Sequence, residues 1–521
     1  KVKPSANLVS PAKTCYYGSA MKTALLLLSL VLLVFLSFGR ILTLFFGSDD
    51  FVAFHDFAIN RHIYDLLYFF DAPRLWPLFH IFRLSPMGYY AVALLFFALA
   101  TLLVFAVSRA IWKRTAVAWF AAAVFGLIAT GDVALYTASE SIRISQYLTL
   151  QLTTILLYLR FLRKNTRKRF GLALALFAIT TLIFPYRAHV MIVLMILLEW
   201  SQGARIRLKT SVQRLLPFLA ATILIYSVAV PLLAASTPGQ IGSLASIPNR
   251  WLSLITNWLP LLMRATATVF FLFLPSLTTG ARMSPAIATP GMFHMAWLAV
   301  FAGFLIILQP KGKRILFFLL AGIGVIVAGY SVVYVDYATP THRYYMMVRP
   351  FLAMLIAGVA AEALRAVKTA GMAKKAAGAL VLLFLSATLV SNIFHHVRVQ
   401  EQVLFNRGPF ANTAIRTITA AIPTLNKFTI IFVDGRTERD RRQFMAMFEN
   451  AGTPGWVLAP YYRVGPEGTE VIDAYHCDLF GKLLSEHRGN VDVYYFFAAN
   501  GRVQQAKSAN AARRCQRPGL F

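Results

Sequence analysis

The sequence predicts an all-α polytopic membrane protein with a small C-terminal α/β domain. Hydrophobic residues account for 58% of the 521 residues and charged residues for only 14%, whereas soluble domains average about 25% charged residues. Many apolar runs approach or exceed the roughly 18 residues that span a bilayer. After about residue 395 the apolar runs shorten to strand length and charges become frequent, which indicates a soluble domain.

The basic residues predict the topology of the membrane part. A net charge of +30 would suggest a nucleic-acid partner in a soluble protein. Here the Lys and Arg residues lie in short loops between apolar runs, as in the cytoplasmic loops of membrane proteins, so we expect no nucleic-acid partner. The basic loops comprise residues 109–114, 160–169, 205–214, 311–314 and 365–375.

The loops divide a transmembrane core, residues 21–394, which follows a polar N-terminal tail at 1–20. Residues 236–293 must cross the membrane an even number of times to keep the basic loops on one side. The expected total is about 11–13 transmembrane helices, with the N-terminus inside and the C-terminus outside. The clearest helices are predicted at 24–46, 87–107, 115–130, 144–162, 170–185, 188–201, 215–235, 294–309, 315–335, 350–367 and 377–394.

Long loops are expected on the outer face of the membrane. The first opens on Asp49-Asp50, directly after the first apolar run. Apolar residues from Phe51 to Phe70 then recur at near-helical spacing with polar residues between them, which predicts an amphipathic helix on the outer membrane surface. The outer loops are 47–86, 131–143, 236–293 and 336–350, with a short turn at 184–187.

The C-terminal domain, residues 395–521, is expected to be extracytoplasmic. Phe428–Val433 and Val491–Ala498 have the length and composition of strands. Asn500-Gly501 is typical of a hairpin turn. Helices are predicted at 411–422 and 437–449.

The cysteines suggest a disulfide and no metal site. Cys477 and Cys515 could pair in an oxidising compartment, which would leave Cys15 unpaired. No CxxC pair or His/Cys cluster has the spacing of metal ligands. We therefore assign no cofactor and leave a divalent cation open.

The outer loops bring acidic and basic residues to one side of the membrane. Positive charges there run against the usual charge bias, and a lipid-linked phosphate or diphosphate would account for them. Transfer of a group from such a carrier needs one carboxylate to take the proton of the attacking hydroxyl, and cations to hold the developing phosphate charge. The carboxylates are Asp49, Asp50, Asp132 and Glu140, and the basic groups are Arg143, Arg187, His342, Arg343 and Arg349.

Three features of this layout resemble the polytopic glycosyltransferases of the GT-C superfamily, which include protein O-mannosyltransferases, lipid A aminoarabinose transferases and oligosaccharyltransferases. An acidic pair, Asp49-Asp50, follows the first helix directly. A later outer loop, Thr137-Ala138-Ser139-Glu140, ends in a Glu before an apolar run. A late outer loop has Arg343-Tyr344 ahead of Pro350 and a helix. Many members also have an Arg-Tyr pair soon after the acidic pair, where this sequence has Ala53-Phe54-His55.

The resemblance implies a site and a reaction. A sugar would pass from a polyprenyl-phosphate donor to a hydroxyl of a glycan, lipid or protein, in a single displacement that inverts the anomeric centre. Asp49 would be the catalytic base and Asp50 its catalytic neighbour. The remaining substrate-binding residues would be Asp132 or Glu140 with Arg143, which orient acceptor or donor, and Arg187, His342, Arg343 and Tyr344 near the phosphate.

The resemblance also implies partners and a location. The C-terminal domain would shape access of the acceptor or bind membrane protein partners. Short cytoplasmic loops favour the bacterial inner membrane, with the N-terminus in the cytoplasm.

Other interpretations remain open at the level of sequence. Glu140 and Arg143, three residues apart, could form a helix ion pair, and Asp132 could be a cap. Arg343 and Tyr344 could anchor a helix at the membrane interface. The whole chain could be a non-catalytic membrane scaffold of a larger complex, or a transporter of lipid or solute, although few charges fall within the predicted spans.

Overall fold

The computed structural model describes most of the chain. The described residues are 11–47, 50–51, 54, 75–202, 208–229, 272–274, 292–331, 343–425, 427–449, 455–462, 468–487, 490–507 and 515. Asp49, His342, most of the predicted interfacial helix and nearly all of 236–293 lie outside them.

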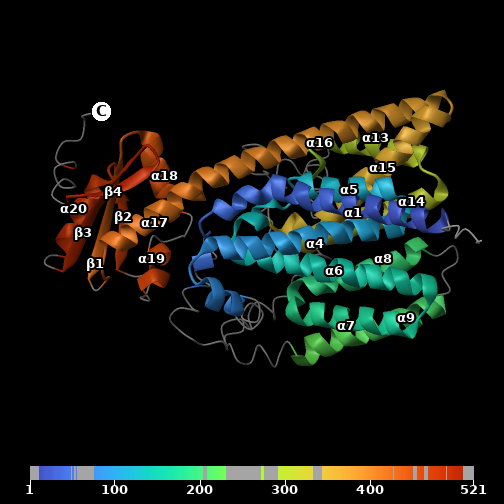
Figure 1. Cartoon of the computed structure of the whole chain (residues 1–521), viewed down its shortest axis with the longest axis horizontal. Helices are drawn as coiled ribbons and strands as arrows, with labels where there is room; N and C mark the ends of the chain where they lie inside the picture. The colour runs from blue at the N-terminus through green and yellow to red at the C-terminus, as the bar shows by residue number, and fades with distance from the viewer. Residues whose placement is uncertain are drawn as a thin grey trace, which may run out of the picture.

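A bundle of helices forms the larger part of the molecule (Figure 1). A helix is present at each position predicted between residues 24 and 394, but several bounds differ, most of all at α1, which begins and ends earlier, and at α16, which ends 13 residues later at Arg407. The bundle elements are α1 (Pro11–Phe38), η1 (Gly39–Thr43), α4 (Pro86–Trp112), α5 (Thr115–Leu127), η2 (Asp132–Tyr136), α6 (Ala138–Lys164), α7 (Arg167–Ile183), α8 (Pro185–Gln202), α9 (Leu208–Leu224), η3 (Ile225–Ala229), α13 (Met292–Ile307), α14 (Pro310–Ser331), η7 (Arg343–Met347), α15 (Arg349–Thr369) and α16 (Met372–Arg407).

The described residues include five helices that are long and apolar enough to cross a membrane. They are Met21–Thr43, Pro86–Trp112, Thr210–Val228, Tyr345–Thr369 and Met372–Ala421. The chain is therefore an integral membrane protein. Helix α5 has only 13 residues. It is therefore about 20 Å long, shorter than the hydrocarbon core of a bilayer, which is about 30 Å thick. The helix ends at Leu127, although the sequence predicted that it would continue to residue 130, and the chain then leads into η2.

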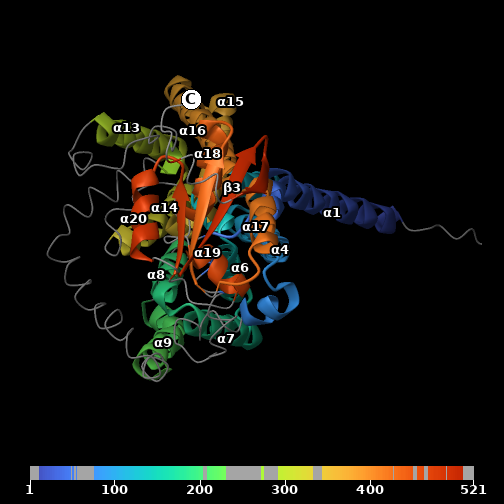
Figure 2. The ribbon, with the colours of Figure 1, turned by 90° about the vertical axis from the view of Figure 1, so that its left-hand side faces the viewer.

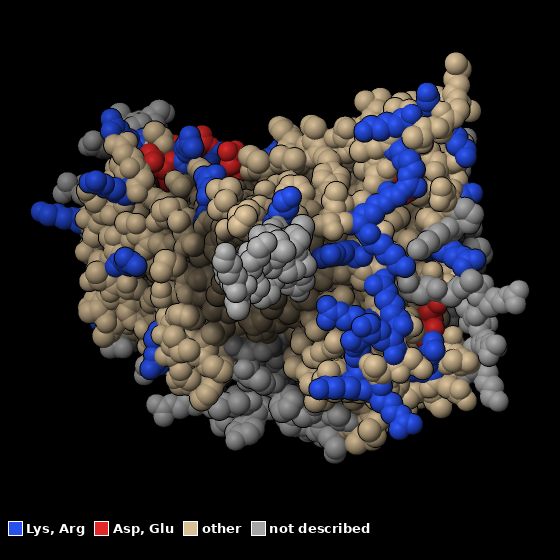
Figure 3. All heavy atoms as spheres, turned by 45° about the vertical axis from the view of Figure 1, so that its right-hand side comes forward, with Lys and Arg blue, Asp and Glu red and all other residues tan. Residues whose placement is uncertain are grey.

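The two ends of the bundle differ in charge. The connections after α4, α6 and α15 lie at the end away from the C-terminal domain (Figure 1), and Lys and Arg gather there in a band (Figure 3). The segments that the sequence predicted on the other side, η2 and η7, lie toward the opposite end. Exposed members of the basic end are Arg109, Lys113, Arg114, Arg163, Lys164, Arg167, Lys168, Lys313, Lys368, Lys374 and Lys375.

The C-terminal domain is a four-stranded sheet with helices, as predicted. Its strand order is β2-β1-β3-β4, in which β1 pairs in parallel with β2 and β3, and β4 pairs antiparallel with β3. Asn500 and Gly501 both have positive φ, 51° and 73°, as the hairpin turn between β3 and β4 requires. Figure 2 views the molecule with this sheet in front of the helix bundle. The elements are α17 (Pro409–Ala421), β1 (Phe428–Gly435), α18 (Glu438–Glu449), α19 (Gly455–Tyr462), β2 (Thr469–Asp473), α20 (Cys477–Glu486), β3 (Val491–Ala499) and β4 (Arg502–Ala506).

A disulfide joins Cys477 to Cys515, with the two Cα atoms 5.3 Å apart and a separation of 38 residues along the chain. Removing such a crosslink raises the conformational entropy of the unfolded domain. We expect Cys477→Ser to lower the free energy of unfolding of the C-terminal domain by about 2–4 kcal/mol. Denaturation followed by the protease sensitivity of the C-terminal domain should show it, and wild-type protein held in reductant should match the variant. Equal stability with and without the crosslink would contradict the expectation.

Helix α16 connects the two parts of the protein. It runs without interruption from the basic end of the bundle to the C-terminal domain (Figure 1), so the domain boundary predicted at residue 395 falls inside it. Its polar residues on the bundle side are buried, including Asn392, His396 and Gln400. These side chains are spaced four residues apart, so they lie on one face of the helix.

Candidate functional site

The carboxylate of Asp50 caps the N-terminus of α6. Its Oδ1 accepts hydrogen bonds from the backbone N–H and the hydroxyl of Ser139, both at 2.6 Å. Its Oδ2 accepts from the backbone N–H groups of Ala138, at 2.9 Å, and Gly47, at 2.8 Å. The first N–H groups of a helix have no partner within the helix, and a carboxylate there also meets the positive end of the helix dipole. Asp50 thereby fixes against α6 the part of the chain that begins at Gly47 and carries the Asp49-Asp50 pair, called the acidic segment below.

Aromatic packing supports this attachment. Phe51 and Phe54 are 1% and 0% exposed, and the ring of Phe54 lies 4.7 Å from that of Phe46 and 4.8 Å from that of Tyr89. The sequence predicted that these phenylalanines face lipid from an interfacial helix. They instead pack inside the protein, because the capped Asp50 brings its neighbours down onto α4.

The environment of Asp50 affects its protonation. Complete burial raises the pKa of the Asp50 carboxyl above its usual value, and the hydrogen bonds from Ser139, Gly47 and Ala138 oppose that effect. Because both oxygens are occupied, Asp50 has the geometry of a positioning group. The catalytic function predicted for it is not tested by this geometry, and Asp49 itself lies outside the described residues.

Asp50→Ala should destabilise the fold by removing these contacts. It leaves the N–H groups of Gly47, Ala138 and Ser139 buried without an acceptor, at a cost of about 1–3 kcal/mol. Ser139→Ala removes only one hydroxyl donor and should cost less, about 1 kcal/mol. Thermal unfolding in detergent measures both, and a variant Asp50→Ala as stable as the wild type would show that the cap contributes nothing.

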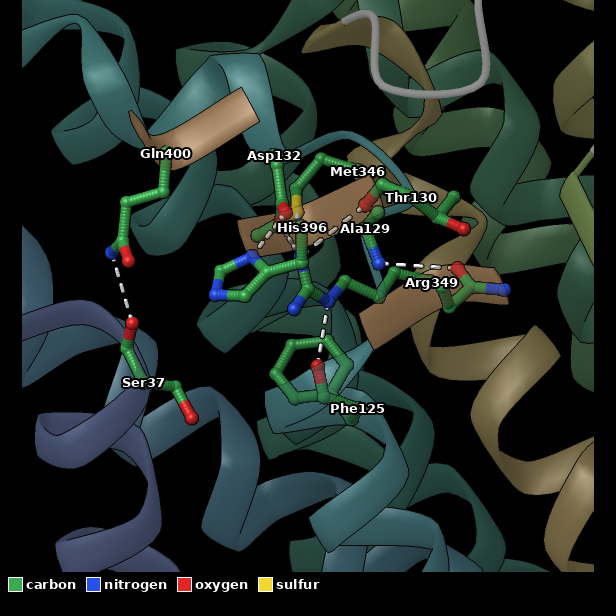
Figure 4. Close-up of polar contacts among 10 residues, drawn as sticks. Ser37, Phe125, Ala129, Thr130, Asp132, Met346, Arg349, His396 and Gln400 are labelled. Carbon is green, nitrogen blue, oxygen red and sulfur yellow. Dashed lines mark hydrogen bonds and ion pairs between the residues drawn. The ribbon is translucent and has the colours of Figure 1, made fainter. Parts of the chain in front are cut away.

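Asp132 forms a second buried cluster with Arg349 and His396. Arg349 Nη1 lies 2.5 Å from Asp132 Oδ1, and His396 Nδ1 lies 2.5 Å from Oδ2. Arg349 and Asp132 are both fully buried. Burial alone would raise the pKa of the Asp132 carboxyl, but the charges of His396 and Arg349 hold it below its usual value. This cluster joins η2, α15 and α16 (Figure 4).

Backbone and ring contacts complete the surroundings of Arg349. Its Nε donates to the carbonyl oxygen of Phe125 at 2.6 Å. Its guanidinium carbon lies 5.3 Å from the ring centre of Phe97 and 5.5 Å from those of Phe38 and Phe125. These rings favour the charge by cation–π attraction. Asp132 is thus engaged by protein groups on both oxygens, which is the arrangement of a structural ion pair.

Two further contacts fasten α16 to the same region. The amide oxygen of Asn392 accepts from the backbone N–H of Ala129 at 3.1 Å, and Gln400 Nε2 donates to the carbonyl oxygen of Ser37 at 3.0 Å (Figure 4). Each partner comes from a loop or helix end near η2 or η1. Helix α16 is therefore bound to the bundle end that carries the acidic segment.

The other predicted site residues are placed as follows. Glu140 and Arg143 form the i, i+3 ion pair that the sequence left open, with Nη1 and Oε2 2.9 Å apart. Glu140 is nearly buried and Arg143 is partly exposed. Arg343 is half-buried in η7, and Tyr344 follows it. Arg187 lies near the start of α8, and His342 lies outside the described residues.

Glu140 and Arg143 lie close in sequence to the residues that bind Asp50. Glu140 directly follows Ser139 in the first turn of α6. The structure thus brings together the acidic segment and the Glu140–Arg143 pair. Asp132 lies in the buried cluster, where its two oxygens bind Arg349 and His396.

Sequence reasoning missed several residues in this region. His396 was not among the predicted site residues, and Arg349 was noted only as one more outer cation, yet both bind Asp132. Arg407 was not singled out, although it lies against Gly47. A signal was present, since polar residues at 392, 396 and 400 interrupt an apolar helix at a spacing of four.

Metal ligands do not cluster in the part of the chain that the structure describes. No group of three His, Cys, Asp or Glu side chains there could hold a metal ion. A divalent cation therefore has no assigned ligands among these residues.

The comparisons with known proteins find likenesses among solved structures alone. The chain matches no protein-family model and no curated protein. It is similar to the oligosaccharyltransferase of Archaeoglobus fulgidus in its apo form, with 11% identity and a TM-score of 0.42, over 81% of this chain and 63% of that one. It is also similar to the oligosaccharyltransferase AglB from Archaeoglobus fulgidus in complex with an inhibitory peptide and a dolichol-phosphate, with 11% identity and a TM-score of 0.45, over 94% of this chain and 70% of that one.

This chain spans less than two thirds of the length of the first of these structures. Scores below 0.5 at this identity do not establish a shared activity.

Proposed function

We propose that this chain is a membrane glycosyltransferase of the GT-C type, which moves a sugar from a polyprenyl-phosphate carrier to a hydroxyl acceptor. The observation that carries the proposal is the attachment of the acidic segment, through Asp50, to the helix that carries Glu140 and Arg143. This attachment lies at the bundle end opposite the basic band. A carboxylate next to Asp50 and a guanidinium on α6 are the groups that such a transfer needs.

Asp49 is the proposed base. The acceptor oxygen attacks C1 of the sugar as the bond between C1 and the phosphate oxygen breaks, and the acceptor proton passes to the Asp49 carboxylate. The phosphate leaves as an anion and keeps the bonding electrons, so no general acid is required. The attack comes from the face opposite the phosphate, which inverts the anomeric centre.

The remaining residues position the two substrates. Asp50 restrains Asp49 because adjacent Cα atoms are held about 3.8 Å apart. Glu140 and Arg143 would orient the acceptor or donor, while Arg187, His342, Arg343 and Tyr344 would bind the donor near its phosphate. Asp132 acts from a distance, by fixing η2 between α15 and α16.

The location follows from the charge of the bundle ends. We place the basic end and the N-terminus in the cytoplasm, in a bacterial inner membrane, with the C-terminal domain outside. The Cys477–Cys515 disulfide agrees with an oxidising outer compartment. The domain would limit access of the acceptor or bind membrane partners.

A reconstituted transfer assay tests the proposal. Purified full-length protein in lipid nanodiscs is supplied with labelled polyprenyl-phosphate sugars and a panel of glycan, lipid and peptide hydroxyl acceptors. Glycosylated acceptor should form in equal amount to the released polyprenyl phosphate, with inverted anomeric configuration. A scaffold subunit would give no product, and retention of configuration would exclude the single displacement.

A further inference from the structure

Arg407 ends α16 beside the acidic segment. Its backbone oxygen accepts a hydrogen bond from the N–H of Phe45 at 2.6 Å. Its guanidinium lies directly against Gly47, such that a Cβ added at Gly47 would collide with Nη1 and would lie 3.2 Å from Oγ1 of Thr137. The last residue of α16, the start of the Asp49-Asp50 segment and the N-cap of α6 therefore meet at one point.

The guanidinium of Arg407 is nearly buried and forms no ion pair with a carboxylate of the described residues. The residue is 9% exposed. Among the described residues, no carboxylate forms an ion pair with it, and the nearby carboxylate of Asp50 is already occupied by four donors. Arg407 also lies within electrostatic reach of Tyr90 on α4. Removing a cation from water is unfavourable unless an anion compensates, so this position favours an anionic ligand.

The surrounding groups suit a phosphate. A guanidinium presents paired N–H donors that match phosphate oxygens, and the hydroxyl of Thr137 adds another donor close by. Because Gly47 has no side chain, the guanidinium of Arg407 can occupy the space directly beside it.

We propose that Arg407 binds the phosphate group of the lipid-linked donor, at the junction of Gly47 and Thr137. This inference rests on the proposed function and adds a phosphate-binding residue that comes from the last helix of the bundle. The charge of Arg407 stabilises the phosphate as the bond between the sugar and the phosphate oxygen breaks. The phosphate would then sit next to the segment that carries the base.

Binding of a polyprenyl monophosphate to full-length protein in nanodiscs tests the inference. Arg407→Gln should raise the Kd at least about 10-fold, and Arg407→Lys should recover part of the affinity because it keeps the charge. Gly47→Ala, which displaces the guanidinium without removing it, should weaken binding in the same direction. Arg398→Gln is the matched control, because Arg398 is exposed on the same helix, and it should bind like the wild type.

Two further ligands identify the source of the phosphate. The corresponding polyprenol should bind wild type and Arg407→Gln alike, and inorganic phosphate should compete only weakly. Equal affinity for inorganic phosphate would mean a site for free phosphate and would overturn the lipid assignment. Thermal unfolding confirms that each variant is folded, and if Arg407→Gln is unstable, Gly47→Ala and Arg407→Lys decide the result.

The outcomes separate this inference from the proposed function. If the wild type transfers sugar and Arg407→Gln does so with unchanged kcat and unchanged KM for the donor, the inference is wrong and the function stands. If the wild type transfers no sugar but binds polyprenyl phosphate through Arg407, the function is wrong and the inference stands. A wild type that does not bind the lipid phosphate contradicts the inference directly.

Discussion

Asp49→Asn is expected to lower the rate of sugar transfer by about 10²–10⁴-fold, the usual contribution of a general base. The amide cannot accept the proton of the attacking hydroxyl, while its size and shape are those of the carboxylate. The acceptor oxygen must then attack without losing its proton in the transition state. The KM for the donor should change little, because the base touches the acceptor.

Initial rates with labelled donor measure this effect, and two further variants serve as comparisons. Glu401→Gln, an exposed acid on α16, should keep the wild-type rate. Asp50→Asn should lower thermal stability as well as rate, because its amide would face the N–H donors of Ala138 and Ser139. If Asp49→Asn retains full activity with normal folding, Asp49 is not the base.

Asp132→Asn is expected to destabilise the folded protein by about 3–5 kcal/mol, the typical cost of breaking a buried ion pair by removing one partner. It leaves Arg349 fully buried without its counter-ion. Arg349→Met should cost a similar amount, since it leaves the Asp132 carboxylate with only His396. The effect of either change is on stability, and the sugar-transfer rate of the protein that remains folded should fall less than in Asp49→Asn.

A double-mutant cycle isolates the ion pair. Asp132→Asn combined with Arg349→Met leaves no unpaired buried charge, so it should be less destabilising than the sum of the two single variants. Unfolding in denaturant at fixed detergent concentration gives the three values. Additive effects would show that the 2.5 Å contact between Arg349 Nη1 and Asp132 Oδ1 contributes no coupling energy.

Regular features of the fold were predictable because they depend on neighbouring residues. Apolar runs and basic loops placed the helices from 24 to 394, and Asn500-Gly501 marked the hairpin of the C-terminal domain. The end of α5 was not predictable. Its apolar pattern continues past Leu127, and the helix ends there because Asn392 on α16 binds the N–H of Ala129.

The site was predictable only in part, for the same reason. The acidic segment and the Glu140 motif stood out in sequence, but the contact between Asp50 and Ala138 joins residues 88 positions apart. The contact between Asp132 and His396 joins residues 264 positions apart. Local patterns cannot show which polar residue of a helix meets which loop, so the functions of Asp50, His396 and Arg407 became visible only in three dimensions.

The continuity of α16 has a consequence for how the protein can be divided. A helix of 36 residues is about 54 Å long, and a tilt of about 5° at one end moves the other by roughly 5 Å. Asn392, His396 and Gln400 hold it against the bundle, so a pull on the C-terminal domain is transmitted to η2 as well as to Gly47. A chain cut at residue 394 would lose His396, Gln400 and Arg407 together. The membrane part and the C-terminal domain are therefore mechanically one unit, although composition divides them into two.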